Sequence, residues 1–177
     1  MAYSNTGAAL LGRALVHVTG ARDYGDLVQR RVCEPLGLAD TLTQDRLDAE
    51  QRERLATGHR RGNRVAAPWP LPGLPGAGAL VSTLPDLLRF AAAQLDPDGT
   101  PLGPAIRLSQ APVQSEIALG WMCATGPGRM LWHNGGTGGF RSFLGLLPGS
   151  GCAVCVLTNR ARSVDLTGLG LLRNLSG

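Results

Sequence analysis

The apolar pattern of this sequence changes from a helical to a strand-like period at about residue 110. Before that point, apolar side chains recur every three or four residues in several segments, as they do in amphipathic helices. After it, short apolar runs are separated by Gly, Pro or Asn, as in strands joined by tight turns. Helices followed by an antiparallel meander are typical of the α+β class. We therefore expect one domain, mainly helical over residues 1–110, with antiparallel strands and a C-terminal helix over residues 111–177.

Two helices are predicted near the start of the chain. The first spans residues 6–19, with Asn5 as a suitable N-cap and Gly20 able to close its end. Its larger apolar residues recur with helical spacing and are Leu10, Leu11, Ala14, Leu15 and Val18. The second helix spans residues 24–33, and the Pro and Gly of the E-P-L-G-L sequence that follows are expected to stop it.

The segment S-T-L-P-D-L-L-R-F-A-A-A-Q-L carries the clearest helical pattern and follows a Pro/Gly-rich loop over residues 62–79. Thr83 and Asp86 have the spacing of a capping box, and Pro85 is tolerated in a first turn. The predicted apolar face of this helix consists of Leu84, Leu88, Ala91 and Leu95. The strand-like runs are residues 116–124, 129–135, 140–148 and 152–159, and a last helix is expected at about 164–172.

All 17 basic residues are arginine, and the chain contains no lysine. A lysine-dependent phosphate loop, a Schiff base and a Ser-x-x-Lys nucleophile pair are therefore excluded within this sequence. The arginines are scattered, apart from two adjacent pairs, and no aromatic residues alternate with them. We therefore expect no nucleic-acid partner. No stretch is long and apolar enough to predict a membrane span.

The spacing of cysteine and histidine predicts no metal site, and we expect no cofactor. Cys152 and Cys155 form a C-A-V-C sequence, but this run has the pattern of a strand. Positions three apart in a strand face opposite sides of the sheet, so these two thiols are not expected to share a metal or a disulfide. Buried thiols are the favoured interpretation of the four cysteines.

Two short stretches carry the side chains best suited to chemistry. Tyr3, Ser4 and Asn5 place a phenol, a hydroxyl and an amide directly before a helix, where they could act in a site or merely cap the helix. His133 stands at the end of a predicted strand, before N-G-G-T-G-G. Glycines there let a ligand approach the backbone and leave N–H groups free for an anion or a carbonyl oxygen. A hairpin turn with an incidental histidine is the alternative interpretation.

Taken together, the motifs occur in an informative order. Tyr-Ser-Asn precedes a helix and is followed by E-P-L-G-L, then by G-A-G-A-L-V-S-T-L-P-D-L-L-R-F, and then by W-H-N-G-G-T-G-G-F-R-S. This series resembles the class C β-lactamase-related group of penicillin-recognising serine hydrolases, which includes D-alanyl-D-alanine carboxypeptidases and carboxylesterases. The resemblance covers residues 3 to about 160. It implies a β-lactamase/transpeptidase-like α+β fold, in which a helical region packs with an antiparallel sheet, and a small-molecule or peptide substrate.

The resemblance also implies roles for the first stretch. Tyr3 and Asn5 match the Tyr-x-Asn element of the family. Tyr3 would shuttle a proton between the nucleophilic serine and the leaving group. Asn5 would hold the carbonyl side of the substrate's amide or ester.

The second stretch matches the His-x-Gly form of a triplet that the family carries on an edge strand. His133 would hydrogen-bond the phenol and position the substrate. Asn134 and Gly135 complete the triplet at the substrate-binding strand, and the backbone N–H of Gly136 would form one half of the oxyanion hole.

The family's nucleophile is a Ser-x-x-Lys pair upstream of Tyr-x-Asn, and this sequence contains none. We therefore expect an inactive fragment, truncated at its N-terminus, whose 152–159 strand is left with an open edge. Two alternatives are a non-catalytic pseudoenzyme that binds a ligand or partner, and one half of a split hydrolase whose N-terminal half carries the nucleophile.

Overall fold

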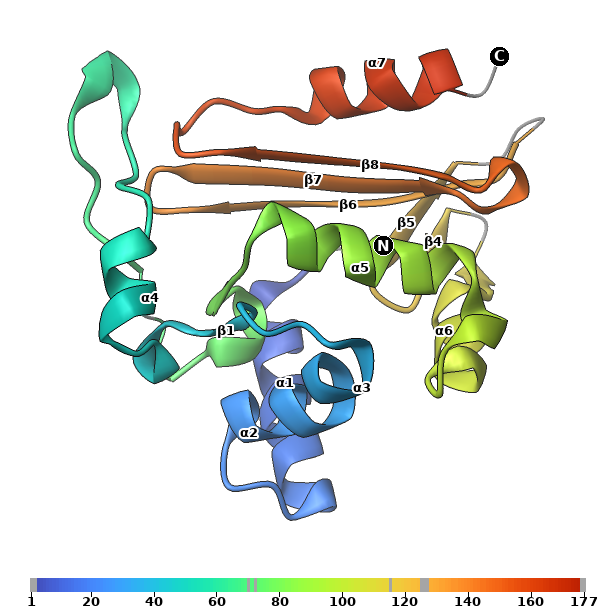
Figure 1. Cartoon of the computed structure of the whole chain (residues 1–177), viewed down its shortest axis with the longest axis horizontal. Coiled ribbons are helices and arrows are strands. Elements are labelled where there is room, and N and C mark those ends of the chain that lie inside the picture. Colours follow the sequence, from blue (N-terminus) through green and yellow to red (C-terminus); the bar gives the residue numbers. More distant parts are fainter. Residues whose placement is uncertain (1–2, 70, 72, 115, 125–127, 176–177) are drawn as a thin grey trace.

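The fold is built around a six-stranded antiparallel sheet (Figure 1). The computed structural model describes residues 3–69, 71, 73–114, 116–124 and 128–175. Strand order in the sheet equals sequence order, and each strand is antiparallel to the next, which confirms the predicted meander. The prediction of one strand over residues 116–124 is wrong, because a turn with Gly120 at φ 81° divides this run into two paired strands, and the first strand of the sheet was not predicted. The strands are β3 (Pro112–Gln114), β4 (Ile117–Ala118), β5 (Trp121–Ala124), β6 (Met130–Thr137), β7 (Phe140–Leu147) and β8 (Cys152–Thr158).

Helices precede the sheet and one helix follows it, as the α+β class requires. A short ribbon joins β1 (Leu42–Thr43) to β2 (Leu80–Val81) within the helical region. The helices are α1 (Asn5–Thr19), α2 (Tyr24–Val28), α3 (Glu34–Leu36), α4 (Ala49–Arg54), α5 (Leu84–Leu95), α6 (Gly103–Gln110) and α7 (Asp165–Leu175).

The two faces of the sheet carry different apolar clusters, because side chains alternate along a strand. On one face, Leu131 and Leu146 pack in a cluster with Ala91 of α5. On the other face, Phe143 packs in a cluster with Leu172 of α7. The sheet is therefore the middle layer of a sandwich, with α5 and α7 on opposite sides (Figure 1).

The first helix is capped differently from the prediction. Ser4, not Asn5, is the N-cap, because its hydroxyl accepts a hydrogen bond from the backbone N–H of Gly7 at 3.1 Å. Asn5 is the first helical residue, so its side chain is free to act elsewhere. Gly20 ends the helix in the left-handed conformation (φ 67°), as predicted.

The apolar stripe of α1 faces outward. Leu10, Leu11 and Val18 are 62%, 60% and 81% exposed. The helix packs instead through its small residues Ala9 and Gly12, which are buried. A Cβ at Gly12 would lie 3.2 Å from the ring of Tyr24, so this side of the helix is in close contact with α2. The close approach of the backbones leaves the larger residues on the opposite side without a partner in the described part of the chain.

The second predicted helix runs further than expected. α2 continues through a π-helical turn (Gln29–Cys33) into α3, which contains Pro35. Proline lies in the first turn of α3, where its missing N–H is tolerated. Gly37 is the residue that ends the helix, in the left-handed conformation predicted for such a cap.

The predicted apolar face of α5 is partly wrong. Ala91 is 1% exposed, but Leu84 and Leu88 are nearly half exposed. The buried positions of this helix also include Asp86 and Gln94. Polar contacts therefore decide how α5 is rotated about its axis.

Asp86 fixes α5 to the segment after α3. Its buried carboxylate accepts hydrogen bonds from the backbone N–H of Asp40 at 2.8 Å and the hydroxyl of Thr41 at 2.9 Å. The guanidinium of Arg89 donates a third at 3.0 Å. A buried carboxylate is stable when donors satisfy it in this way, so the D-T of the E-P-L-G-L-A-D-T segment holds the helical region against the sheet-bound helix.

The strand β8 has one unpaired side, as predicted. It pairs with β7 along its full length and is the last strand in the order of the described sheet. Cys152 packs with the α7 cluster, whereas Cys155 lies opposite Leu144 and faces α5. The two thiols are therefore on opposite faces and are free, as expected. Cys33 and Cys123 are buried, as predicted, whereas Cys152 and Cys155 are only partly buried.

An acid-sensitive ion pair stabilises the turn between α1 and α2. Asp26 is buried at the start of α2 and accepts hydrogen bonds from the side chain and the backbone N–H of Arg22. These bonds lower the pKa of the Asp26 carboxyl to about 2. The group is ionised in the folded chain at a pH where it is protonated in the unfolded chain, so its contribution to stability is complete above about pH 4 and is lost as the pH falls toward 2.

We expect Asp26→Asn to lower the urea midpoint at neutral pH and to flatten its decline between about pH 4 and pH 2. The control is Asp98→Asn, whose carboxylate is 87% exposed in a surface pair with Arg107. Parallel pH profiles for Asp26→Asn and the unchanged chain would contradict this assignment.

Candidate active site

The glycine-rich stretch lies within β6 and not after it. The strand passes through His133 and continues to Thr137, so the prediction that His133 ends a strand is wrong. The reason is pairing: each residue from His133 to Thr137 has a partner in β7. The turn itself is formed by Gly138 and Gly139, and Gly139 has a φ of 82°, which favours glycine.

One side of this part of β6 is open. β5 pairs with β6 only from Met130 to Trp132. From His133 to Thr137, no strand of the described chain lies on that side. In an antiparallel ladder, alternate residues direct their N–H and C=O groups to alternate sides. The open side therefore presents backbone donors and acceptors to any molecule that lies along it.

Two residues from the start of the chain meet this strand. The ring of Tyr3 lies 6.3 Å from the ring of His133, centroid to centroid, at an interplanar angle of 52°. The phenol of Tyr3 donates a hydrogen bond to Oδ1 of Asn5 at 3.1 Å. Tyr3 is 68% exposed, so its hydroxyl remains accessible. Tyr3 therefore links two other predicted site residues, Asn5 by a hydrogen bond and His133 by a ring contact. The predicted hydrogen bond from His133 to the phenol is not among those of the described residues, because the phenol donates to Asn5 instead.

The side chain of Asn134 lies apart from these three. Successive residues of a strand face opposite sides, and the Asn134 amide donates to Asp165 at the start of α7 (3.0 Å). His133 and Gly135 share the other face with Leu131, which packs toward α5. The side chain of Asn134 therefore lies on the opposite face of the sheet from His133 and bonds α7.

Gly135 and Gly136 lie close to side chains across the ladder. A Cβ at Gly135 would lie 2.7 Å from the hydroxyl oxygen of Ser142, and one at Gly136 would lie 2.8 Å from the guanidinium of Arg141. That guanidinium donates to the carbonyl of Phe140 at 2.8 Å and is held in place. Glycine at both positions keeps side chains away from the strand beside its open edge.

Ser142 was not singled out from the sequence. It pairs with Gly135 and lies on the same face as His133. Its hydroxyl forms no hydrogen bond within the described chain, and it is partly exposed. The sequence could have shown this position: if Gly138 and Gly139 form a two-residue turn, counting outward along both strands places Ser142 opposite Gly135.

A loop from the helical region supports the hairpin. The backbone N–H of His59 donates to the carbonyls of Gly139 (3.3 Å) and Asn159 (2.8 Å). Gly58 approaches Gly138 so closely that a Cβ at Gly58 would lie 2.6 Å from the Gly138 carbonyl oxygen. The loop therefore holds the turn that follows β6 in place.

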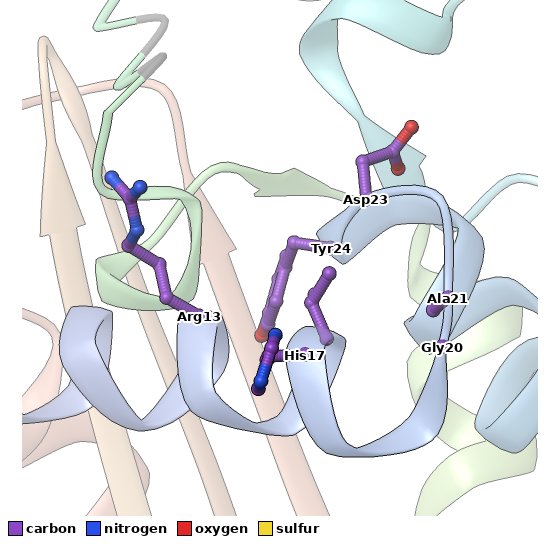
Figure 2. Close-up of a pocket in the computed structure, with 7 residues that line it drawn as sticks. Arg13, His17, Gly20, Ala21, Asp23 and Tyr24 are labelled. Atoms are coloured by element: carbon purple, nitrogen blue, oxygen red, sulfur yellow. The ribbon is translucent and has the colours of Figure 1, made fainter.

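A separate hollow of about 510 Å³ lies between α1 and α2 (Figure 2). Figure 2 shows the imidazole of His17 beside the ring of Tyr24, while the guanidinium of Arg13 extends away from them. None of Tyr3, Asn5 and His133 lines this hollow. The hollow is therefore separate from the contacts that Tyr3 makes with Asn5 and His133.

Within the described residues, no three side chains of His, Cys, Asp or Glu are grouped as metal ligands would be. Among the helices described, none combines the length and the apolar character needed to cross a membrane.

The family model for Beta-lactamase matches residues 1–175. The chain belongs to the beta-lactamase family. Its relatives include Penicillin-binding protein 4 of Amycolatopsis lactamdurans, which is 32% identical over 90% of this chain and 47% of its own length. Unguisins hydrolase ungD' of Aspergillus campestris is 29% identical over 98% of this chain and 36% of its own length. A putative beta-lactamase-like 1 protein of Homo sapiens is 31% identical over 82% of this chain and 31% of its own length.

Solved structures establish the fold of this beta-lactamase family chain. A class C beta-lactamase aligns with a TM-score of 0.87 at 19% identity, over 99% of this chain and 57% of its own. The octameric penicillin-binding protein homologue from Pyrococcus abyssi aligns with a TM-score of 0.80 at 23% identity, over 99% of this chain and 42% of its own. The fold is therefore β-lactamase/transpeptidase-like. The chain spans about half the length, or less, of the curated relatives it matches.

Proposed function

We propose that this chain supplies the proton-transfer and substrate-binding side of a serine hydrolase site that performs acyl transfer on a β-lactam, a D-alanyl peptide or a small ester. One observation carries the proposal: Tyr3, Asn5 and His133 meet beside the open side of β6. In this proposal Tyr3 relays the proton to the leaving group, and Asn5 and His133 orient the phenol and the substrate carbonyl.

The strand supplies the remaining contacts. An extended acyl substrate can lie along the open side of β6 and pair with its backbone, as peptides do when they add to a sheet edge. The N–H of Gly136 is the proposed oxyanion donor. Because Gly135 and Gly136 lack side chains, the substrate carbonyl can approach the backbone closely.

Histidine in the triplet favours esters and peptides over penicillins. A lysine would fix a permanent positive charge near a substrate carboxylate, and this triplet has histidine in place of that lysine. We therefore place esterase or peptidase chemistry ahead of penicillinase chemistry.

The chain by itself is proposed to be inactive. It contains no lysine, so it has no Ser-x-x-Lys nucleophile. The backbone N–H of that serine would have been the second oxyanion donor, and losing one such donor typically costs about 100- to 1,000-fold in rate. Without the nucleophile as well, acyl transfer has no covalent path.

Two alternatives are a non-catalytic ligand-binding or partner-binding protein and one half of a split hydrolase. The exposure of Leu10, Leu11 and Val18 on α1, together with the unpaired side of β8, favours the second of these. An apolar helix face and an open strand edge are surfaces that a further polypeptide would cover.

The test is ligand binding without turnover. We expect the purified chain to bind D-alanyl-D-alanine, measured by titration with NMR or calorimetry, and to hydrolyse neither a chromogenic cephalosporin nor a short-chain nitrophenyl ester. His133→Ala should weaken this binding about 10-fold, the effect of one lost hydrogen bond of about 1.4 kcal/mol.

The matched control is His17→Ala, since His17 lies in the α1–α2 hollow. It should leave the dissociation constant unchanged. Equal weakening in both variants, or hydrolysis by the unchanged chain, would count against the proposed site.

A further inference from the structure

Charge is divided unevenly between the two regions of the molecule. Residues 55–85 and 117–164 contain seven arginines and no Asp or Glu. The rest of the chain contains ten arginines and all 13 acidic residues. Glu116 lies between β3 and β4, so the whole sheet and the loop that supports its hairpin carry an excess of six positive charges, while the helical region carries a small negative excess.

Five of these arginines are gathered at one end of the sheet, and we call them the arginine patch. They come from the loop over residues 59–65 and from the segment after β8. Backbone hydrogen bonds join the two segments, since Ala161 N–H donates to the carbonyl of His59 at 2.8 Å. The loop is closed by a bond from Arg60 N–H to the carbonyl of Arg64 at 2.7 Å. The members, all exposed, are Arg60, Arg61, Arg64, Arg160 and Arg162.

The patch has no acidic partner in the described chain. Elsewhere arginines are paired: Arg22 with Asp26, Arg46 with Asp23, and Arg54 with Asp40. None of the five patch residues forms an ion pair with a described residue, and residues 59–65 and 159–164 contain no Asp or Glu. The nearest acid along the chain, Asp165, accepts a hydrogen bond from Asn134. Like charges gathered at one end of a molecule repel one another. An anionic partner would remove this repulsion.

Two exposed apolar side chains accompany the arginines: Val65 follows Arg64 in the loop, and Trp69 lies after the loop, with its ring close to Gly138 of the hairpin. Val65 is 69% exposed and Trp69 is 50% exposed. Figure 1 shows this loop (turquoise to green, upper left) standing out beyond the ends of the strands. A projecting tip cannot enclose a ligand, but it can rest on a flat surface. Arginine with tryptophan and an aliphatic residue is the composition that binds at the boundary between lipid headgroups and acyl chains.

We propose that the arginine patch, with Val65 and Trp69, is a docking surface for a membrane that carries anionic lipid headgroups. The arginines bind lipid phosphates, and the two apolar side chains enter the interface. Docking there leaves the open side of β6 uncovered, because the patch lies at the hairpin end and His133 lies further along the strand. Peripheral docking of this kind requires no membrane-spanning helix.

The test compares two double variants with equal changes in net charge. Arg61→Gln with Arg64→Gln removes two patch charges. Arg13→Gln with Arg31→Gln removes two exposed charges from the helical region, neither of which is in an ion pair with a described residue. Binding of the full chain to phosphatidylcholine vesicles with and without about 30% phosphatidylglycerol is measured by co-sedimentation at low and high salt.

We expect binding to the anionic vesicles only, with an affinity that falls as salt rises. Each patch arginine is worth about five-fold in affinity, from about 1 kcal/mol per basic residue at an anionic surface. The patch variant should therefore bind about 25-fold more weakly, and the control variant about as well as the unchanged chain. Circular dichroism of both variants checks that they fold.

Three results would overturn the proposal. Equal losses in the two double variants would mean that net charge, and not the patch, governs binding. Equal binding to neutral vesicles would remove the role of anionic headgroups. Displacement from the vesicles by inorganic phosphate or polyuridylate at matched salt would assign the arginines to a soluble anion or to nucleic acid.

Discussion

Replacing Tyr3 with phenylalanine is expected to lower the rate of acyl transfer about 100- to 10,000-fold once the chain is completed with a nucleophile. The completed enzyme would carry an added N-terminal segment that contains Ser-x-x-Lys ahead of Tyr3. Phenylalanine keeps the ring next to His133 but removes the hydroxyl that bonds Asn5. The proton then has no carrier between the serine and the leaving group.

The measurement is kcat/KM for a short-chain nitrophenyl ester in the completed enzyme. Tyr24→Phe is the matched control, because Tyr24 lines the α1–α2 hollow and has no contact with the proposed site. The control should retain full activity. If Tyr3→Phe and Tyr24→Phe were equally active, the proton relay would have to be assigned to another group.

Replacing Phe143 with alanine is expected to destabilise the fold by about 3–5 kcal/mol. Phe143 is 0% exposed in β7, and its ring stacks on Trp132 at 6.0 Å. Gly168 of α7 lies so close to this ring that a Cβ there would overlap it. The helix therefore packs directly on Phe143, and the cavity left by alanine cannot easily collapse.

Chemical denaturation followed by circular dichroism measures this loss. A domain of this size is typically stable by about 5–15 kcal/mol, so the variant should be close to unfolding at room temperature. Leu166→Ala is the control, since Leu166 lies on α7 and is 86% exposed. Its effect should be below about 0.5 kcal/mol. Equal effects at both positions would mean that α7 is not held by Phe143.

The sheet was predictable because its signals are local. Strands β6, β7 and β8 are bounded by Gly, Pro or Asn, and short connections between these neighbouring runs leave antiparallel pairing as the simple outcome. β3 and the start of β4 have no such boundary residues, and these two strands were not predicted separately. The helix ends at Gly20 and Gly37 were also predictable from local sequence, because glycine readily adopts the left-handed conformation that ends each helix.

The orientation of the helices was not predictable in the same way. Apolar spacing identifies α1 and α5, but it cannot show that α1 packs through Ala9 and Gly12. Nor can it show that the buried carboxylate of Asp86 sets the rotation of α5. The orientations of these two helices depend on contacts between segments that are distant in sequence. The helix α6 was missed because G-P-A-I-R-L-S-Q is short and weakly apolar.

Part of the candidate site could likewise be predicted from motifs, and part depended on the pairing of the strands. Tyr3, Asn5 and His133 were singled out by motif, and the structure places them together. The separation of Asn134 from them follows from the two-residue period of β6, once the strand is known to continue past His133. Ser142 needed the register of the hairpin, which no single motif contains.

The most direct test of the central claim is the intact mass of the purified chain after incubation with benzylpenicillin. We propose that the chain has the proton relay and the substrate strand but no nucleophile. The mass should therefore stay at that of the unmodified 18.5 kDa protein, even at penicillin concentrations at which binding is saturated. A stoichiometric increase equal to one penicilloyl group would contradict it, because some serine of this chain would then form the acyl-enzyme.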